Sequence, residues 1–263
     1  MELLDAIRTL ENEGKRDLAH RQLQHCSHIF RYAVATGRAD TDITVNLKGA
    51  LQPVKSKHYA HLSAKELPAF LNKLNGYDTN YNGHILTKLA FQLLILTFVR
   101  SGEIRGARWE EINLSEAIWK IPAERMKMKT PHFVPLSSQS ITLLKEIRLI
   151  TGNNPSGYVF PSQKTPHKIM SENTFLRAID IMGYKEKTTG HGFRSTASTI
   201  LNENNFARDV IERQLAHCER DQVRAAYNHA EYLPQRKAMM QWWGDYIDSL
   251  YSHNKIIPIH LRA

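Results

Sequence analysis

Cysteine is scarce in this chain, whose 263 residues contain only Cys26 and Cys218. Two thiols so far apart in the sequence exclude a disulfide framework and a four-thiolate zinc site, so we expect both to be free in a reducing compartment. Long hydrophobic runs are missing too, because no apolar stretch reaches the ~20 residues that a helix needs to span a bilayer. Residues 1–5 also lack the charged start of a signal peptide, and we therefore expect a cytoplasmic protein without a membrane anchor.

Several enzyme signatures are absent as well. Neither a Gly-x-Ser-x-Gly motif nor a phosphate-binding loop occurs in the sequence. The close histidine pairs, His25 with His28 and His58 with His61, have no acid or cysteine in a zinc-like arrangement, so solvated histidines explain them better than a metal hydrolase does. We expect neither a metal nor a cofactor.

Basic residues, in contrast, are in excess. Lys and Arg number 35 against 26 Asp and Glu, which gives a formal net charge of +9. A surface of this kind attracts a polyanion, either nucleic acid or an anionic membrane, and charge alone does not choose between them. The 42% hydrophobic and 23% charged residues are typical of a globular protein, long enough for one large domain and a small one.

The N-terminal part of the chain predicts a small helical module, residues 1–51. Apolar residues recur at helical spacing within 16–36, and shorter helices are predicted before it, over 3–13, and after it, over 45–51. Residues 52–62 are polar, basic and without periodicity, as in an interdomain linker. Its Lys55 and Lys57 suit a segment that crosses a phosphate backbone, although an ordinary solvated linker explains them equally well.

The remainder, residues 63–263, predicts a second and larger domain. Ser63 and Glu66 form a capping box, in which the serine accepts from the third free amide and the glutamate reaches back. A buried helix is predicted over 84–99. Three short alternating runs predict a three-stranded antiparallel sheet: 108–112, 117–121 and 132–136. Helices then follow at 138–151, 171–182, 192–203, 207–215, 222–229 and 233–251, with a basic tail over 252–263. The fold class is mainly α with this small sheet, that is, α+β.

The stretch from His191 to Tyr227 carries residues suited to phosphoryl transfer without a metal. An arginine such as Arg194 grips two phosphate oxygens, histidines such as His191 and His217 exchange protons with the others, and a phenol can attack phosphorus. His191 and Arg194 stand three residues apart and therefore share a helix face. A His-x-x-Arg pair is also common on solvated surfaces, and Tyr227 could be a packed aromatic whose phenol, with an ordinary pKa near ~10, needs help to ionise.

Two residues from earlier in the chain complete such a site. Arg100 closes the buried helix 84–99, where it either caps the helix or supplies a second guanidinium, with Glu103 fixing the local turn. Lys127 lies on the predicted hairpin turn, from which an ammonium can reach a leaving oxygen; most hairpin lysines are simply solvated.

Seven blocks, in order and in spacing, resemble the tyrosine site-specific recombinases, and among them the integrases of satellite prophages and genomic islands. The resemblance covers nearly the whole chain, and its blocks are 96–103, 121–129, 132–137, 191–194, 212–217, 225–228 and 240–243. It implies a recombinase catalytic domain over 63–263, preceded by a partial core-binding, DNA-clamping domain over 1–51.

The resemblance also implies a role for each candidate residue. Arg100 and Arg194 would hold the scissile phosphate, with His217 on one of its oxygens. Tyr227 would be the nucleophile that joins the 3′-phosphate, which leaves a free 5′-hydroxyl and requires neither ATP nor metal.

The same resemblance implies that His191 assists proton transfer at the nucleophile. It also implies that Lys127 protonates the departing 5′-oxygen. Lys129 lies in the same turn and could replace Lys127, or contact DNA. Tyr232 could rival Tyr227, although its spacing from His217 fits less well.

The partners implied are double-stranded DNA at attachment sites, including transfer-RNA gene ends, an excisionase and a host DNA-bending protein. Four protomers act in the synaptic complex, and the free protein is expected to be a monomer associated with the nucleoid. No arm-binding domain and no first helix of the core-binding domain precede Met1, so we expect a fragment or a truncated gene. The alternatives are a prophage remnant that binds DNA without completing recombination, and a type IB topoisomerase, which the integrase-like blocks disfavour.

Overall fold

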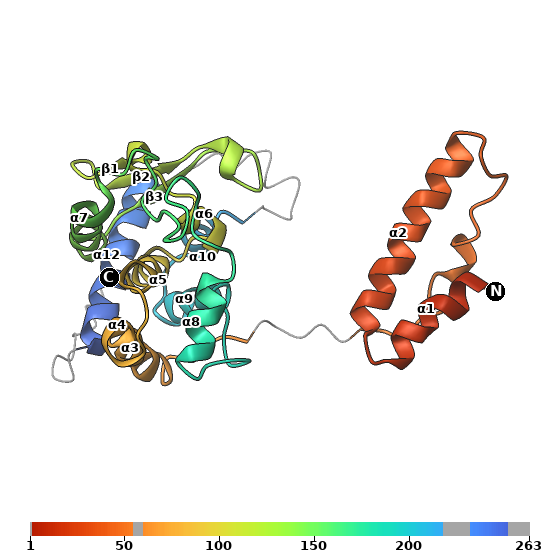
Figure 1. Ribbon diagram of the computed structural model, residues 1–263, viewed down its shortest axis with the longest axis horizontal. Helices are drawn as coiled ribbons and strands as arrows, with labels where there is room; N and C mark the ends of the chain where they lie inside the picture. The colour runs from red at the N-terminus through yellow and green to blue at the C-terminus, as the bar shows by residue number, and fades with distance from the viewer. Residues whose placement is uncertain (1, 55–59, 218–231, 252–263) are drawn as a thin grey trace. The chain divides into compact units, whose positions relative to one another are not determined.

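The computed structural model describes residues 2–54, 60–217 and 232–251. The chain divides into two compact units, 1–58 and 59–263 (Figure 1). The helix predicted over 222–229 and the tail over 252–263 lie outside the described residues. The class of fold is as predicted: mainly helical, with one small antiparallel sheet.

The smaller unit is a pair of helices, α1 (Glu2–Asn12) and α2 (Arg16–Ala35), packed against each other. Its buried core consists of Ile7, Ala19 and Leu51. The helix predicted over 45–51 is wrong in extent, since only η1 (Val45–Leu47), a 3₁₀ turn, forms there. Lys48 is extended and Gly49 has a φ of +85°, so the backbone leaves the helical region at once.

The larger unit is built around α5 (Ile85–Thr97), which has ten buried residues. A helix that is apolar on every side needs neighbours on every side. The helices that pack on α5 include α3 (Leu67–Asn75), α4 (Tyr77–Asn80), α7 (Ser138–Thr151), α8 (Thr174–Ile181) and α12 (Leu233–Tyr251). In Figure 1 the sheet lies at one end of this unit and α3 and α4 at the other.

The sheet has the order β1-β2-β3 and is antiparallel throughout, with strands β1 (Ile112–Asn113), β2 (Ile118–Ile121) and β3 (His132–Pro135). Trp119 faces Val134 across the central pair, and both side chains are fully buried. The strand predicted over 108–112 is wrong for most of its length, because η2 (Trp109–Glu111) is a 3₁₀ turn. Glu111 causes this turn by accepting a hydrogen bond from the Arg108 amide.

Two predicted helix boundaries are also corrected. Before α3, which begins at Leu67, the Ser63 hydroxyl donates to the Glu66 carboxylate (2.7 Å) instead of accepting from an amide. The second half of the predicted capping box does form, because the Ser63 amide donates to Glu66 (2.9 Å). At the other boundary α5 already ends at Thr97, because Phe98 takes a left-handed φ of 39°. Arg100 consequently begins a short helix that the sequence did not indicate, α6 (Ser101–Arg105), rather than closing α5.

Candidate active site

Arg100 lies where α6 begins, and its guanidinium is held on two sides. Its Nη1 donates to Glu103 Oε1 (2.9 Å), and its Nη2 donates to the carbonyl oxygen of Ala216 (3.0 Å). Glu103 is itself buried and also accepts from the Arg100 amide (2.7 Å). About a quarter of the Arg100 side chain (26%) remains exposed, so the fixed cation still faces solvent.

Arg194 belongs to α9 (Gly192–Glu203) and is almost completely buried, at 3% exposure. Its Nη1 donates to the carbonyl of Phe98 (2.8 Å) and its Nη2 to that of Leu215 (2.5 Å). Burial, and next the charge of Arg100, lower its pKa to about 10, so it remains a cation at neutral pH. Within the described residues its buried Nε has no hydrogen-bond partner, an arrangement that costs roughly 1–3 kcal/mol.

His217 directly follows Leu215 and Ala216, whose carbonyls accept hydrogen bonds from the two arginines. It lies just after α10 (Arg208–Gln214), and its Nδ1 is 2.8 Å from Glu212 Oε2, with both side chains about two-fifths exposed. Leu215 and Ala216 accept from Arg194 and Arg100 respectively, so residues 215–217 form one backbone strip that connects both cations to His217. Ala216 has a left-handed φ of 47° within this strip.

His191 immediately precedes α9 and is exposed at its surface. Partial burial of the ring, followed by the charges of Arg194, His217 and Arg100, lowers the pKa of His191. A lowered pKa keeps the imidazole neutral at pH 7, in the form that accepts a proton. Since charges act strongly only over short distances, the four basic side chains gather in one place.

Lys127 is exposed in the turn between η3 (Ala123–Arg125) and β3. It shares a cavity of about 440 Å³ with Arg100 and His191, and the other lining residues are Ser101, Gly102, Glu103, Arg125 and Met126. Arg194 and His217 do not line this cavity but connect to Arg100 through the strip 215–217. Lys129, two residues further on, is exposed, and its Nζ is 3.4 Å from the carbonyl oxygen of Glu124.

Three predicted residues lie outside the part of the chain that the structure describes: Tyr227, Lys55 and Lys57. Tyr232, the rival of Tyr227, is half-buried and packs against the main core. That packing gives Tyr232 a structural role of its own.

Sequence reasoning missed a buried polar cluster next to this site. Arg236 of α12 is fully buried, and its Nε and Nη2 donate to Gln214 Oε1 (3.1 and 2.8 Å), while Nη2 also contacts the Phe133 carbonyl. Gln214 in turn donates to the Thr97 carbonyl (3.3 Å). His132 Nε2 lies 3.1 Å from the Gln214 carbonyl, and burial, then the charge of Arg236, lowers its pKa to about 3.

A signal for this cluster does exist in the sequence. Arg236 precedes Met239, Met240 and Trp243 by three, four and seven residues, so it lies on the apolar face of its helix. A charged residue on such a face is rarely buried unless it is paired.

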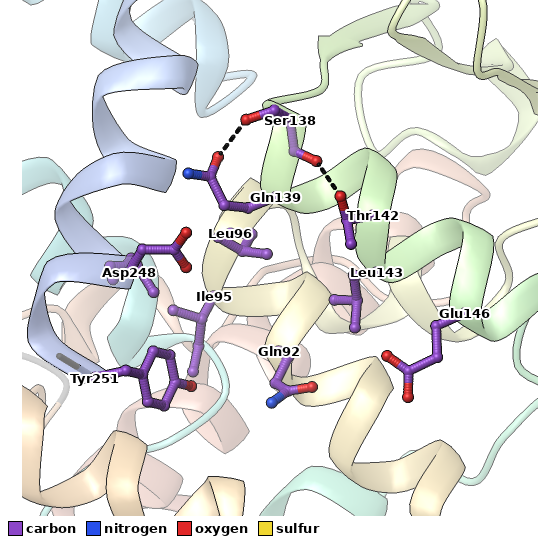
Figure 2. A pocket seen from close by; sticks show the side chains of 11 residues that line it. Gln92, Ile95, Leu96, Ser138, Gln139, Thr142, Leu143, Glu146, Asp248 and Tyr251 are labelled. Atoms are coloured by element: carbon purple, nitrogen blue, oxygen red, sulfur yellow. Dashed lines mark hydrogen bonds between the residues drawn. The ribbon is translucent and has the colours of Figure 1, made fainter.

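A second cavity, of about 410 Å³, lies between α5, α7 and the end of α12, and Figure 2 shows its lining residues. The hydroxyl of Thr142 donates to the Ser138 carbonyl at its wall (3.0 Å). Among the residues that the structure describes, the charged ones lining it are Glu146 and Asp248, with no lysine or arginine. Carboxylates repel a phosphate, so this cavity does not suit phosphoryl chemistry.

Within the described ranges, no three His, Cys, Asp or Glu side chains are grouped so that they could hold a metal ion. None of the helices there combines the length and the apolar character that crossing a bilayer demands. Cys26, on α2, is a free thiol, and Cys218 lies outside the described residues.

The arrangement of helices around a small sheet is the fold of the integrase catalytic domain. A lambda integrase dimer bound to a COC′ core site matches with a TM-score of 0.64 and 20% identity, over 86% of this chain and 63% of that one. A lambda integrase tetramer bound to a Holliday junction matches equally well, with a TM-score of 0.64 and 20% identity, over 84% of this chain and 64% of that one. At such identities the likeness defines the fold alone.

The sequence decides the family. Residues 61–233 match the phage integrase family, and residues 1–50 match the phage integrase central domain. The integrase of Enterobacteria phage P4 is 41% identical over 273 residues, 98% of this chain and 60% of that protein. This chain therefore belongs to the phage integrase family, which confirms the predicted resemblance, and it spans about 60% of the length of that relative.

Proposed function

We propose that this protein is a tyrosine-type integrase, which cuts and rejoins DNA at specific sites and thereby integrates or excises a mobile element. The observation that carries the proposal is the backbone strip 215–217, because it accepts hydrogen bonds from both Arg100 and Arg194 and leads directly to His217. Two guanidinium groups fixed on one strip, beside two histidines, suit the oxygens of a single phosphodiester.

The arginines and His217 bind the scissile phosphate in this proposal. Within the described residues, each Nη of Arg100 and Arg194 donates one hydrogen bond to the protein, and its second N–H is the proposed donor to an anion. The buried Nε of Arg194 supports the same assignment, since a phosphate oxygen would satisfy it. Charge that develops on the phosphate oxygens is thus met by donors already in position.

Tyr227 is the proposed nucleophile. Its phenolic oxygen forms a bond to phosphorus while the bond from phosphorus to the 5′-oxygen breaks, and the product is a 3′-phosphotyrosine with a free 5′-hydroxyl. His191 accepts the phenolic proton, a role that suits a histidine with a lowered pKa. Lys127 gives a proton to the 5′-oxygen, with Lys129 as the alternative donor. Rejoining reverses these steps with another strand and needs neither metal nor cofactor.

The rest of the proposal concerns DNA and partners. Residues 1–51 belong to a core-binding domain, 52–62 to a linker, and 63–263 to the catalytic domain. Lys55, Lys57 and Lys129 contact phosphates, which agrees with the net charge of +9. The substrate is double-stranded attachment-site DNA, including transfer-RNA gene ends, on which four protomers assemble in the cytoplasm, at the nucleoid. An excisionase and a host DNA-bending protein are the further partners.

Covalent trapping tests the proposal. The protein is incubated without added metal with nicked duplexes that carry candidate attachment cores from the DNA flanking its gene, and denaturing gels are used to detect a protein–DNA adduct. We expect an adduct with the wild type and with Tyr232→Phe, and none with Tyr227→Phe. Binding without any adduct would instead indicate a remnant that binds DNA only, and an adduct with Tyr227→Phe would exclude Tyr227 as the nucleophile.

A further inference from the structure

An ion pair outside the predicted site lies beneath the turn that carries Lys127. The Nη1 of Arg125 contacts both carboxylate oxygens of Glu111, and its Nη2 donates to the carbonyl of Glu103. Arg125 is 21% exposed and Glu111 only 6%. A pair this well shielded is held more firmly than a surface ion pair, whose contribution is small.

Glu111 is fixed by groups other than Arg125. Trp119 Nε1 donates to Glu111 Oε2 (3.0 Å), and the Arg108 amide donates to the same oxygen (3.2 Å). Trp119 is fully buried on the central strand β2. The carboxylate is therefore a rigid anchor that belongs to the sheet.

Arg125 connects this carboxylate to Glu103 of α6, the residue that binds Arg100. The carbonyl that accepts from Arg125 belongs to Glu103, whose carboxylate grips the amide and the Nη1 of Arg100. The guanidinium also packs closely on α6, because a Cβ added at Gly106 would lie 3.2 Å from Nε of Arg125. One side chain thus sets the spacing between the sheet turn and α6.

Lys127 follows Arg125 by two residues, and Met126 between them is buried at 3% exposure. From Lys127 onward the turn is exposed. Arg125 and Met126 are thus the last fixed points before the lysine, and both line the same cavity as Lys127 and Arg100.

We infer that Arg125, held by Glu111, is a positioning residue that sets how far the Lys127 ammonium stands from the phosphate held by Arg100. This inference rests on the proposed function, in which Lys127 protonates the leaving 5′-oxygen. Arg125 touches no reacting atom in this role, because both of its Nη atoms are engaged with the protein.

The test uses two versions of the duplex that gives the adduct, one ordinary and one with sulfur in place of the 5′-bridging oxygen. Sulfur leaves as a thiolate, since a thiol has a pKa near ~8.5, and its departure needs no proton donor. Single-turnover cleavage is compared for wild type, Lys127→Ala, Arg125→Ala, Arg125→Lys and Glu111→Gln. Arg125→Lys keeps the charge but cannot bridge both acceptors.

We expect Lys127→Ala to cleave the ordinary duplex about 100-fold more slowly or worse, the usual size of a general-acid contribution. Arg125→Ala should lose roughly 10- to 100-fold, as expected for a displaced catalytic group. Both variants should recover to within a few-fold of wild type on the sulfur duplex. Arg125→Lys and Glu111→Gln should slow cleavage of the ordinary duplex less than Arg125→Ala does. On the sulfur duplex they too should cleave at nearly the wild-type rate.

Two controls separate this role from a structural one. Arg100→Ala should be slow on both duplexes, because a phosphate-binding group is needed whichever atom leaves. Lys88→Ala breaks a comparably shielded ion pair, Lys88 with Asp78 at 2.9 Å, and should leave cleavage of both unchanged. Melting temperatures of all variants are measured alongside, so that unfolding is recognised.

The results distinguish a failure of the positioning role from a failure of the proposed proton donor. If Lys127→Ala is rescued by sulfur while the Arg125 and Glu111 variants are equally slow on both duplexes, or are not slow at all, the positioning role is wrong and the proposed function stands. If Lys127→Ala itself is not rescued, Lys127 is not the acid, and the proposed proton donor and the positioning role both fall.

Discussion

At the scale of single residues, the site is defined by how its cations are held. Arg100 and Arg194 donate to backbone carbonyls and to one buried carboxylate, and their mutual repulsion contributes to the lowered pKa of Arg194. His191 stands among the same charges and responds in the same direction. An anion that enters would relieve this repulsion, which is a physical reason for the site to prefer one.

The lowered pKa of His191 predicts the pH dependence of cleavage. Neutral imidazole accepts the phenolic proton, so the rate should fall only when the pH drops below the ordinary histidine value of ~6.5. Single-turnover adduct formation, followed from pH ~5 to ~8, should show this acid limb in the wild type, whereas His191→Asn should be slower and lack it. A limb above ~6.5, or one that persists in the variant, would contradict the assignment.

At the scale of elements, Arg236 and Gln214 connect four segments of the chain. Through them α12 is joined to α10, to β3 at Phe133 and to the end of α5 at Thr97. The ends of the described chain on either side of residues 218–231 are tied together by this contact. A buried cation with several acceptors is costly to remove, because each acceptor is then left without a donor.

Replacement of Arg236 by methionine should therefore destabilise the protein by roughly 2–4 kcal/mol, since Gln214 Oε1 and the Phe133 carbonyl lose their donor. Urea unfolding followed by circular dichroism measures the change. The neighbouring Lys237 is exposed, so Lys237→Met is a matched control expected to change stability by less than ~0.5 kcal/mol. Equal effects of the two substitutions would show that the buried cluster contributes little.

The sequence predicted the elements far better than their connections. Helices such as α2, α7 and α9 were found within about a residue, because their apolar spacing is local. The 3₁₀ turn at Trp109–Glu111 was mistaken for a strand, since its cause includes the contact of Glu111 with Trp119. Single side-chain contacts of this kind leave no periodic signal.

The candidate site follows the same rule. Motif order predicted Arg100, His191, Arg194 and His217 as site residues. In the structure Arg100 and His191 line one cavity, and the strip 215–217 connects Arg100 to Arg194 and His217. The place of Arg236 on an apolar helix face was a signal that it is buried, but its partner Phe133 is 103 residues away in the chain and could not be predicted. Arg125 was missed because its partners, Glu111 and the carbonyl of Glu103, lie on two other elements. Residues that position a site are defined by such contacts, and a single sequence does not state them.

At the scale of the whole molecule, the two units have very unequal cores. Within the described residues, the larger unit contains nearly all the buried apolar side chains, whereas three form the buried core of the smaller one. Stability rises with the apolar surface that folding buries, and a domain of only about 60 residues is marginal even with a well-formed core.

We therefore expect a fragment of residues 60–263 to unfold cooperatively on its own, and a fragment of residues 1–58 to be much less stable. Thermal unfolding of each fragment, followed by circular dichroism, measures this. The full chain serves as the reference. A fragment 60–263 without a cooperative transition would mean that the larger unit depends on the smaller one.

The hydrogen bonds to the strip 215–217 determine which residues of the site can be substituted. Arg100 and Arg194 grip peptide oxygens, which every amino acid possesses, and the path of the backbone rather than the identity of its side chains specifies the cradle. The left-handed turn at Ala216 is the bend that aims these oxygens, and it is a conformation that glycine and asparagine adopt readily. The two arginines must therefore stay as they are, whereas the side chains of residues 215 and 216 can be substituted as long as the backbone keeps its bend.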